Sequence, residues 1–257
     1  MTNRRDGVLA RAFLVLSTFG DGRRNQTLSE LSRLTGLPVN TTLRIARSLM
    51  DEGALERDSA GRFSIGLRMF ELSSLTPRIM DVRQVALPFL ADLRDLTGQH
   101  ALLTVREDDE AVLVERLSKR GATAVRYRIG GRLPLDATGG GLALLAFAPH
   151  EVRERAIDRF QPRVIDRLGS AADLRRMLAE IRAAQSVVAT QAAGEGLESV
   201  AVPIIVSGDQ PTAAISVILP RDDDPARFIP ALSACARAIA RQLVQGFRPM
   251  EFAQSIE

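Results

Sequence analysis

The sequence predicts an α+β protein in two parts: a small domain of three helices and a β-hairpin, and a larger domain in which helices frame a sheet. Two observations support this prediction. Residues 4–52 repeat apolar side chains every three or four positions before two short strand-like runs appear. Beyond residue 81, strand-like and helical segments follow one another without the strict alternation of βαβ units. We therefore expect domains at residues 1–66 and 81–250, joined by a linker helix and hinge at residues 67–80.

The bulk composition is that of an ordinary globular protein. Apolar residues make up 46% of the 257 and charged residues 25%, which is enough material for a full core. No apolar run reaches the roughly 18–20 residues of a membrane span, and no signal-type segment follows the N-terminus, so we expect a cytoplasmic protein without membrane contacts. One cysteine, Cys235, excludes an intramolecular disulfide, and two histidines are too few for most metal sites. We expect no cofactor.

The excess positive charge lies entirely in the first part of the chain. Residues 1–76 contain 11 arginines and 8 acidic residues, a balance of +3, whereas residues 77–257 contain 23 basic and 23 acidic residues. A basic N-terminal domain fits a nucleic-acid partner, although an asymmetry of this size does not establish one alone.

A capping box starts a helix near residue 28. In the segment TLSE of residues 27–30, the threonine hydroxyl and the glutamate carboxylate can each satisfy a backbone group at the helix start. Gly36 can adopt the left-handed conformation that ends a helix, and Pro38 can begin the next one. We therefore expect two helices, over residues 28–35 and 39–52, joined by a tight turn.

The second of these helices has an apolar side and a polar side. Spacings of three and four residues place these side chains on the apolar side: Thr42, Ile45, Ala46 and Leu49. The opposite side carries hydrogen-bonding groups and no carboxylate before Asp51: Asn40, Thr41, Arg44, Arg47 and Ser48. This face suits a DNA major groove, where arginine bonds guanine and asparagine bonds adenine. A lone amphipathic helix would more often present a solvated face, so the neighbouring elements decide the interpretation.

A β-hairpin follows at once. Residues 54–57 and 62–65 are strand-like runs on either side of the turn-forming segment DSAG, residues 58–61. A helix-turn-helix followed by a hairpin is a winged helix. Arginines on the wing can hold the phosphate backbone, or they can be ordinary solvated side chains. The predicted DNA-binding residues are Thr27, Asn40, Thr41, Arg44, Arg47, Ser48, Arg57 and Arg62.

Two further helices flank the winged helix. An apolar stripe over residues 4–19 predicts a leading helix that covers the inner faces of the next two helices, and residues 67–75 predict a linker helix that ends at Thr76 and Pro77. Both helices carry apolar residues suited to pairing with a second copy. A homodimer or homotetramer could then bind double-stranded DNA at a pseudo-palindromic operator.

The second domain is predicted to open with a helix over residues 81–97, whose apolar stripe is Val82, Val85, Leu90, Leu93 and Leu96. Strands are expected over residues 100–106, 111–117, 122–129, 186–190, 199–206 and 212–219. Helices are expected over residues 142–147, 151–160, 171–184 and 226–245. The glycine-rich segment TGGG, residues 138–141, precedes the first of these helices.

Four segments resemble the IclR family of bacterial transcriptional regulators, in the family's order and across nearly the whole chain. The segments are residues 37–44 (LPVNTTLR) with 52–57 (EGALER), 63–66 (FSIG), 130–141 (GGRLPLDATGGG), and 194–197 (GEGL) with 200–204 (VAVPI). The resemblance implies a GAF-like effector-binding domain and ligand-controlled repression or activation of a promoter. The expected effector is a small organic acid, and the expected targets are catabolic genes.

The resemblance also implies an effector site between the glycine-rich segment and a late strand. It assigns these residues to effector binding: Val125, Leu133, Gly139, Gly140, Ala189, Leu197 and Ser199. Amide groups at a helix start, beside glycines that let a ligand approach closely, suit a small carboxylate. The chain departs from the family at residues 188–192 (VATQA), which are often acidic there, and at Glu198, a place commonly basic. Neither a two-carbon keto acid nor an aromatic acid is therefore implied. Arg126, Arg128 and Arg132 are possible partners for a carboxylate.

Two other classes of function compete with a regulator. An enzyme acting on a small acid would need a nucleophile or an acid-base pair, but Cys235 falls on an apolar helix face and is predicted to be a core residue. His100 and His150 have no catalytic motif beside them, and the glycine-rich segment lacks the ending of a P-loop. The other rival is a winged helix used only for protein contacts, which salt-dependent binding to promoter DNA would exclude.

Overall fold

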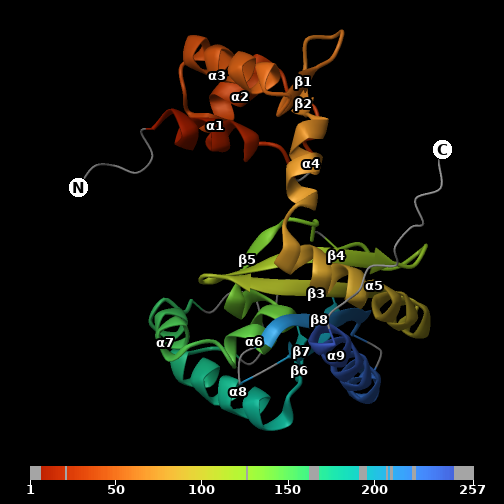
Figure 1. Ribbon diagram of the computed structural model, residues 1–257. Coiled ribbons are helices and arrows are strands. Elements are labelled where there is room, and N and C mark those ends of the chain that lie inside the picture. Colours follow the sequence, from red (N-terminus) through yellow and green to blue (C-terminus); the bar gives the residue numbers. More distant parts are fainter. Residues whose placement is uncertain are drawn as a thin grey trace, which may run out of the picture. The chain divides into compact units, whose positions relative to one another are not determined.

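The computed structural model describes residues 7–20, 22–125, 127–161, 168–190, 196–206, 208, 211–221 and 224–245, except for the side chains of residues 77 and 78. The chain divides into two compact units, residues 1–80 and 81–257 (Figure 1). Within the described ranges, no helix is long and apolar enough to cross a membrane.

The first unit is a winged helix-turn-helix. Its elements, in chain order, are α1 (Val8–Leu16), α2 (Leu28–Thr35), α3 (Val39–Asp51), β1 (Leu55–Arg57), β2 (Phe63–Ile65) and α4 (Leu67–Ser74). β1 and β2 form the antiparallel wing. The predicted helices and hairpin are all present; the first residues of the predicted leading helix and Asp21 lie outside the described ranges.

The capping box of α2 forms as predicted. The Thr27 hydroxyl accepts a hydrogen bond from the Glu30 amide at 3.3 Å, and the Thr27 amide donates to the Glu30 carboxylate at 2.7 Å. The backbone hydrogen bond holds the pKa of Glu30 below its ordinary value. Gly36, with φ of 70°, ends the helix in the left-handed conformation. These local interactions end α2, and α3 begins after the three residues 36–38.

The core of the first unit joins α1, α2 and α3 to the wing. It consists of Val15, Phe19, Leu31, Ile45, Ala46, Leu55 and Phe63. Gln26 exchanges two backbone hydrogen bonds with Phe63 and so adds a bridge beside β2. Its side-chain amide donates to Thr18, while its carbonyl oxygen is buried without a partner in the described structure. The wing is therefore fixed to the helices by packing and by backbone pairing.

The second unit is a six-stranded antiparallel sheet covered on both faces. Its strands are β3 (His100–Glu107), β4 (Glu110–Ser118), β5 (Arg132–Pro134), β6 (Val187–Thr190), β7 (Leu197–Ile205) and β8 (Pro211–Pro220), in the order β5-β4-β3-β8-β7-β6. Figure 1 shows α6 (Gly139–Leu145), α7 (His150–Asp158) and α8 (Ala171–Ala184) over one face, and α5 (Pro77–Thr97) and α9 (Ile229–Val244) over the other. This mixed, curled arrangement matches the predicted α+β, GAF-like class.

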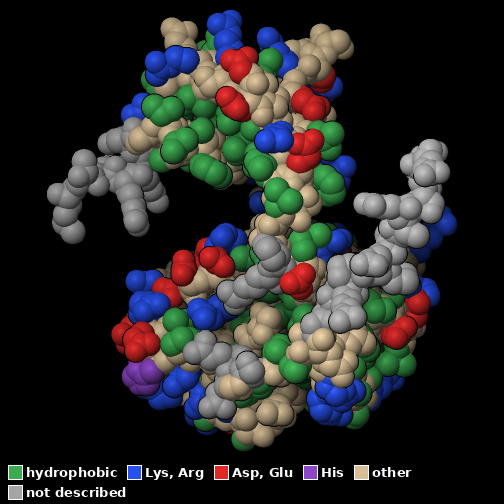
Figure 2. Space-filling view, in the orientation of Figure 1, with side chains coloured by type: hydrophobic (Ala, Val, Ile, Leu, Met, Phe, Trp, Pro, Cys, Tyr) green, Lys and Arg blue, Asp and Glu red, His purple; other side chains and the backbone are tan. Residues whose placement is uncertain are grey.

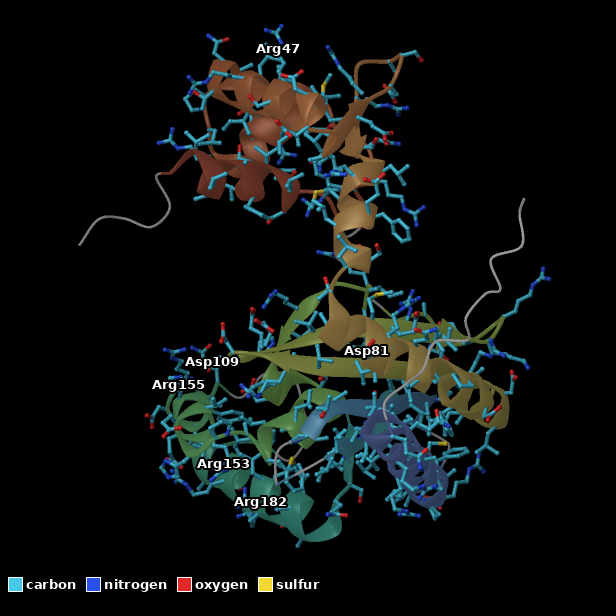
Figure 3. All side chains as sticks on the ribbon, viewed as in Figure 1. Arg47, Asp81, Asp109, Arg153, Arg155 and Arg182 are labelled. Carbon is cyan, nitrogen blue, oxygen red and sulfur yellow. The ribbon has the colours of Figure 1, made fainter. Side chains whose placement is uncertain are left out.

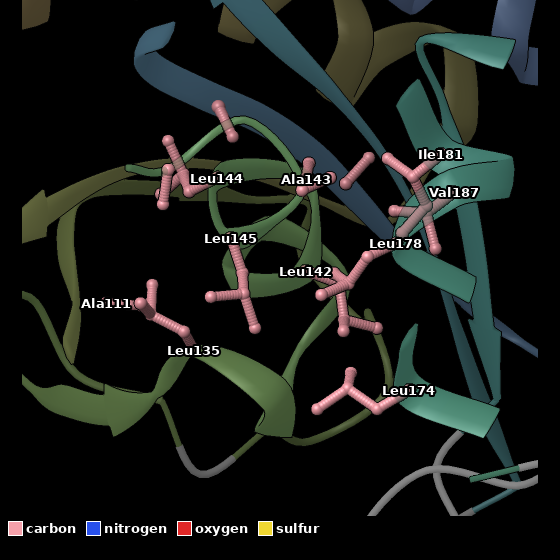
Figure 4. Close-up of a cluster of buried hydrophobic side chains, with 14 of the residues drawn as sticks. Ala111, Leu135, Leu142, Ala143, Leu144, Leu145, Leu174, Leu178, Ile181 and Val187 are labelled. Carbon is pink, nitrogen blue, oxygen red and sulfur yellow. The ribbon is translucent and has the colours of Figure 1, made fainter. Parts of the chain in front are cut away.

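A buried helix lies at the centre of the second unit. Every residue of α6 is buried, and Leu142, Leu144 and Leu145 are completely excluded from solvent (Figure 4). They pack against α8 and against small residues of the sheet, such as Ala201 and Ala214. At the rim, Asp109 in the turn between β3 and β4 binds Arg155 of α7 at 2.6 Å (Figure 3). Hydrogen bonds from Arg155 hold the pKa of Asp109 below its ordinary value.

A β-bulge changes which residues of β4 face α6. Leu103 pairs with Glu115 but Thr104 pairs with Leu113, so Val114 has no partner in β3. Because side chains alternate along a strand, the extra residue reverses the alternation beyond it. Leu113 and Arg116 consequently share the face of the sheet that α6 covers, while Glu115 faces α5.

The strand predicted over residues 122–129 is wrong. Apart from residue 126, which lies outside the described ranges, this stretch is irregular, and the edge strand is β5 instead. Side chains bind the carbonyl oxygens that a strand ladder would use: His100 binds that of Thr123, and Arg116 those of Val125 and Tyr127. Propensity alone could not distinguish this segment from a strand.

Several boundaries and burial predictions also differ. α5 begins at Pro77, earlier than residue 81, because proline is well suited to the first position of a helix. Leu96, predicted to be buried on α5, is 58% exposed. α6 begins at Gly139 instead of residue 142, because Thr138 caps it by accepting from the Gly141 amide. The C-terminal segment divides into a 3₁₀ turn, Pro225–Phe228, and α9.

Candidate functional site

The polar face of α3 is exposed as the sequence predicts. Asn40, Arg44, Arg47 and Ser48 are exposed and Thr41 is half-buried, whereas Thr42, Ile45 and Ala46 are buried. Figure 3 shows Arg47 pointing outward from α3, and Figure 2 shows basic side chains over this part of the first unit. Within the described ranges, neither Arg44 nor Arg47 has an ion pair or side-chain hydrogen bond. Both guanidinium groups can therefore meet a base edge or a phosphate without first breaking a contact.

The other predicted DNA contacts have structural tasks already. The Thr27 hydroxyl donates to the Glu30 carboxylate at 2.8 Å. Arg57 donates to the Gly61 carbonyl at 3.1 Å and lies over the Phe63 ring. The Arg62 guanidinium binds the Asp58 carboxylate at 2.9 Å. The hydrogen bond from the Arg62 backbone amide is the main cause that lowers the pKa of Asp58. The wing arginines brace the hairpin, and each has further N–H groups that a phosphate can share.

An apolar groove runs between α1 and α3. It is lined by Val8, Leu9, Arg11, Ala12, Arg44, Ile45, Ser48, Leu49 and Glu52. Figure 2 shows the hydrophobic side chains gathered over α1. Leu9 is 76% exposed and Phe13 63% exposed, so α1 has a second apolar side that the core of its own unit does not cover. α4 likewise exposes Leu67, Phe70 and Leu72.

The second unit contains a narrow cavity between the start of α6 and the sheet. Its lining consists of Leu102, Thr104, Ala111, Leu113, Tyr127, Leu133, Thr138, Gly139, Gly140, Ser199, Ser216 and Ile218. Its volume, counted as the space that the centre of a water molecule can occupy, is only about 30 Å³. Among the described residues that line it, none carries a charge. The cavity is thus an apolar chamber with a few polar groups, which is the usual form of a small-molecule site.

The polar groups of the cavity form a row of three hydroxyls on adjacent strands. Thr104 of β3, Ser216 of β8 and Ser199 of β7 are 8%, 5% and 6% exposed. Ser216 pairs with Leu102 of β3 and with Ala201 of β7. Thr104 and Ser199 each lie two positions from these paired residues, so the three hydroxyl side chains lie diagonally across one face of the sheet. None of these hydroxyls has a hydrogen-bond partner in the described structure. Each hydroxyl can donate and accept a hydrogen bond, so the row can bind a polar group of a ligand or water in the cavity.

The seven residues assigned to the effector site are divided by the structure. Leu133, Gly139, Gly140 and Ser199 line the cavity. Val125 and Leu197 belong to an adjoining apolar cluster that shares Leu102, Leu113 and Ile218 with the cavity wall. Ala189 lies beside Ser199 in the sheet but packs into the core under α6 and α8.

Thr104, Tyr127 and Ser216 also line the cavity, although they are not among the residues predicted from the sequence. A hydroxyl inside an otherwise apolar strand is the signal that could have identified Thr104 and Ser216. Tyr127 gives no such signal, because it lies in an irregular segment and reaches the cavity only through the fold.

The glycines of α6 allow the helix to pack closely against the sheet. A Cβ atom at Gly139 would meet the Ser199 Oγ atom at 2.3 Å, and one at Gly140 would meet the Thr104 Oγ1 atom at 3.1 Å. A Cβ atom at Gly141 would meet the Leu135 carbonyl oxygen at 2.4 Å. The three glycines therefore let α6 approach the sheet closely. Because Gly139 and Gly140 also line the cavity, close approach of a ligand to them stays a prediction.

The candidate carboxylate partners and catalytic groups lie elsewhere. Arg132 binds Glu110 at the sheet edge, neither it nor the exposed Arg128 lines the cavity, and Arg126 is outside the described residues. Cys235 is only partly buried, a correction to its predicted place in the core, and burial raises the pKa of its thiol. His100 is buried against Ser118 and Thr123, and His150 is on the surface of α7.

Comparisons with known protein families cover both units. Residues 76–241 match the family described as bacterial transcriptional regulator IclR C-terminal, and residues 8–59 match the IclR helix-turn-helix domain. The chain belongs to the IclR family. It is a DNA-binding transcriptional regulator with an effector domain, and the relatives it matches are regulators, not enzymes.

Curated IclR relatives come from several bacteria. The transcriptional regulator KipR of Bacillus subtilis is 33% identical over 157 residues, which span 61% of this chain and 62% of KipR. XynR of Escherichia coli is 26% identical over 240 residues, covering 91% of this chain and 95% of XynR. The glycerol operon regulatory protein of Streptomyces coelicolor is 27% identical over 246 residues, covering 93% and 96%.

Solved IclR structures have the same architecture. An IclR homolog from Microbacterium hydrocarbonoxydans, solved in complex with 4-hydroxybenzoate, is 34% identical, with a TM-score of 0.86 over 92% of this chain and 99% of that one. The IclR protein of Thermotoga maritima is 22% identical, with a TM-score of 0.71 over 92% and 98%, and supports the fold alone.

Proposed function

We propose that this IclR-type regulator binds a small organic acid in the cavity of the second unit, and that binding changes its affinity for DNA. The observation that carries the proposal is the row of unpartnered hydroxyls, Thr104, Ser216 and Ser199. Hydroxyls in a mainly apolar chamber form stronger hydrogen bonds than they do at a surface. An acid whose oxygen atoms meet the row, and whose carbon skeleton meets Leu102, Leu113 and Leu133, would satisfy both kinds of lining.

The ligand chemistry follows from the absence of charge along the described lining. A carboxylate bound here would rely on hydroxyls and on backbone amides at the start of α6, not on an arginine. The Microbacterium relative was solved with an aromatic hydroxy acid, which makes 4-hydroxybenzoate a natural first probe. Only about 30 Å³ of the cavity admits the centre of a water molecule, room for one or two waters, so a ring-sized acid requires side chains of the wall to move.

We further propose that the regulator acts as a homodimer or homotetramer on a pseudo-palindromic operator, and that its targets are catabolic genes. One α3 helix contacts too few base pairs to select a site in a genome, so two copies should bind half-sites about one helical turn apart or a multiple of it. The uncovered apolar sides of α1 and α4 support pairing. Control of catabolic genes is consistent with relatives such as the glycerol operon regulator.

Calorimetry with the full chain tests the ligand. 4-Hydroxybenzoate and benzoate should bind, whereas 4-hydroxybenzyl alcohol, which has the same ring but no carboxylate, should bind more weakly. Fluorescence anisotropy with the DNA upstream of the gene then measures whether the acid changes operator affinity. Binding of the alcohol as tightly as the acid would overturn the assignment to an acid, and unchanged DNA affinity at saturating acid would overturn regulation.

A further inference from the structure

One side of the cavity is formed by a segment that is not part of the sheet. We call residues 122–125 and 127–131 the crossing segment. It is irregular, and it carries Tyr127, which lines the cavity, and Val125, which packs beside it. A wall without a strand ladder holds its shape only through the individual contacts that anchor it.

Three residues of β3 and β4 anchor the crossing segment. His100 donates from Nε2 to the Thr123 carbonyl at 2.5 Å, since a carbonyl can only accept. Leu113 exchanges backbone hydrogen bonds with Gly130 and Gly131 at 2.7 and 3.0 Å. Between these two anchors, Arg116 donates from Nη1 to the carbonyls of both Val125 and Tyr127. Arg116 therefore holds the middle of the segment, next to the side chain that lines the cavity.

The residue beside Arg116 is fixed from the opposite face of the sheet. Glu115 is buried, with 4% of its surface exposed. One carboxylate oxygen accepts from Arg83 of α5 at 2.6 Å and 2.8 Å, and the other accepts from the backbone amide of Arg116 at 2.9 Å. A buried carboxylate needs such partners, because an unpaired charge in the interior is costly. The position of the Arg116 backbone is thus tied to a helix on the other side of the sheet.

We infer that Arg116 positions the Tyr127 wall of the cavity, and that the Arg83 and Glu115 pair holds Arg116 in place and so links this wall to α5. This inference rests on the proposed effector function of the cavity. α5 follows the linker helix in the chain, so the link joins the ligand site to the helix that leads back to the DNA-binding unit. A ligand that moves Tyr127 would act on α5 through two charge-assisted contacts and not through the hydrophobic core.

The chain contains its own probe for this link. Tyr127 is its single tyrosine, and the sequence has no tryptophan, so tyrosine fluorescence reports only on the cavity wall. Quenching by acrylamide measures how far the wall opens, and no ligand is needed. Hydrogen exchange of the crossing-segment amides measures the same opening independently. Variants are compared under conditions in which circular dichroism shows each to be fully folded.

Replacing Arg116 with Gln should increase quenching of Tyr127 and accelerate exchange in the crossing segment by roughly tenfold or more, because hydrogen bonds from a charged group are lost. Arg83→Met should also increase quenching and accelerate exchange, although Arg83 lies on the other face of the sheet. Arg83→Lys keeps the positive charge, so both readouts should return most of the way to their wild-type values. Arg94→Met is the matched control: it is on the same helix and loses an ion pair with Asp95, and it should leave Tyr127 as in the wild type.

Each outcome decides one part of the inference. Unchanged quenching in Arg116→Gln would remove the positioning role. Unchanged quenching in Arg83→Met, or an equal rise in Arg94→Met, would remove the link to α5. A calorimetric failure to bind any organic acid would instead count against the proposed effector function and would leave these ligand-free measurements valid.

Discussion

Gly139 and Ser199 are so close that no side chain fits between them. A Cβ atom on Gly139 would lie 2.3 Å from the Ser199 Oγ atom, while the next nearest atom, the Ser199 Cβ, would lie at 3.3 Å. The hydroxyl alone is therefore responsible for the most severe clash. This contact joins α6 to β7 at the edge of the cavity, so the packing of the unit and the shape of its ligand site depend on the same pair.

The first prediction is that Gly139→Ala destabilises the protein by about 1–3 kcal/mol, the usual cost of overpacking a filled interior. In a Ser199→Ala background the same substitution should cost much less, because the atom it meets is absent. Urea unfolding of the four proteins in a double-mutant cycle measures this coupling. An equal cost in both backgrounds would contradict the geometric explanation.

The second prediction concerns Arg44 on the exposed face of α3. Arg44→Ala should weaken binding to the best operator by about 1–3 kcal/mol and relax the preference at one base position, if the guanidinium reads a base edge. Arg68→Ala removes the same charge from α4, where the side chain pairs with Glu71, and should change affinity much less. Anisotropy titrations on an operator and its single-base variants distinguish the two. A uniform loss across all variants would assign Arg44 to phosphate instead.

The third prediction concerns assembly through α1. Leu9→Asp combined with Phe13→Asp should shift the protein toward monomer, because charged residues would replace two exposed apolar side chains on one side of the helix. Leu96→Asp, at a similarly exposed position of α5, serves as the control. Sedimentation velocity at micromolar concentration gives the oligomeric state. Retention of the wild-type assembly in the double variant would place the interface elsewhere.

The fourth prediction concerns acid titration at the end of α5. The side-chain hydrogen bond from Arg94, and next that from Lys119, lowers the pKa of Asp95 from 3.8 to about 2. The folded pKa is below the unfolded one, so these contacts stabilise the protein above about pH 4 and their contribution is lost as the pH falls toward 2. Asp95→Asn should therefore be less stable than the wild type at pH 5, with a difference that disappears near pH 2. A carboxyl carbon NMR titration should show Arg94→Met raising the pKa of Asp95 more than Lys119→Met does.

The winged helix could be predicted from sequence because its signals are local. The capping pair Thr27 and Glu30 lies within four residues, Gly36 marks its own conformation, and the turn of residues 58–61 separates two strands directly. The polar face of α3 follows from helical periodicity alone. Each of these signals can be recognised without knowing what lies across the fold.

The cavity was only partly predictable because it is assembled from distant segments. Thr104, Ser199 and Ser216 become neighbours only through the strand order β3-β8-β7, which no local pattern contains. The crossing segment has the composition of a strand, but Arg116 and His100 take its carbonyls. The bulge at Val114 reverses the alternation along β4, so even a correct strand would have assigned Arg116 to the wrong face.

The last prediction uses the three hydroxyls to determine how a ligand lies in the cavity. If the carboxylate of 4-hydroxybenzoate meets the row, Ser216→Ala and Thr104→Val should each weaken its binding by about 1.5–3 kcal/mol, the range for a hydrogen bond to a charged group. If the phenol meets the row instead, each loss should be about 0.5–1.5 kcal/mol, and benzoate should then be almost insensitive to both substitutions. Ser199→Ala belongs in the same series, although it also relaxes the contact with Gly139. Ser233→Ala, on α9 at the other face of the sheet, is the control and should bind as the wild type does. Calorimetry with both acids on all four variants therefore separates the two orientations. If Ser216→Ala, Thr104→Val and Ser199→Ala each bound both acids as tightly as the wild type does, the row would not contact the ligand.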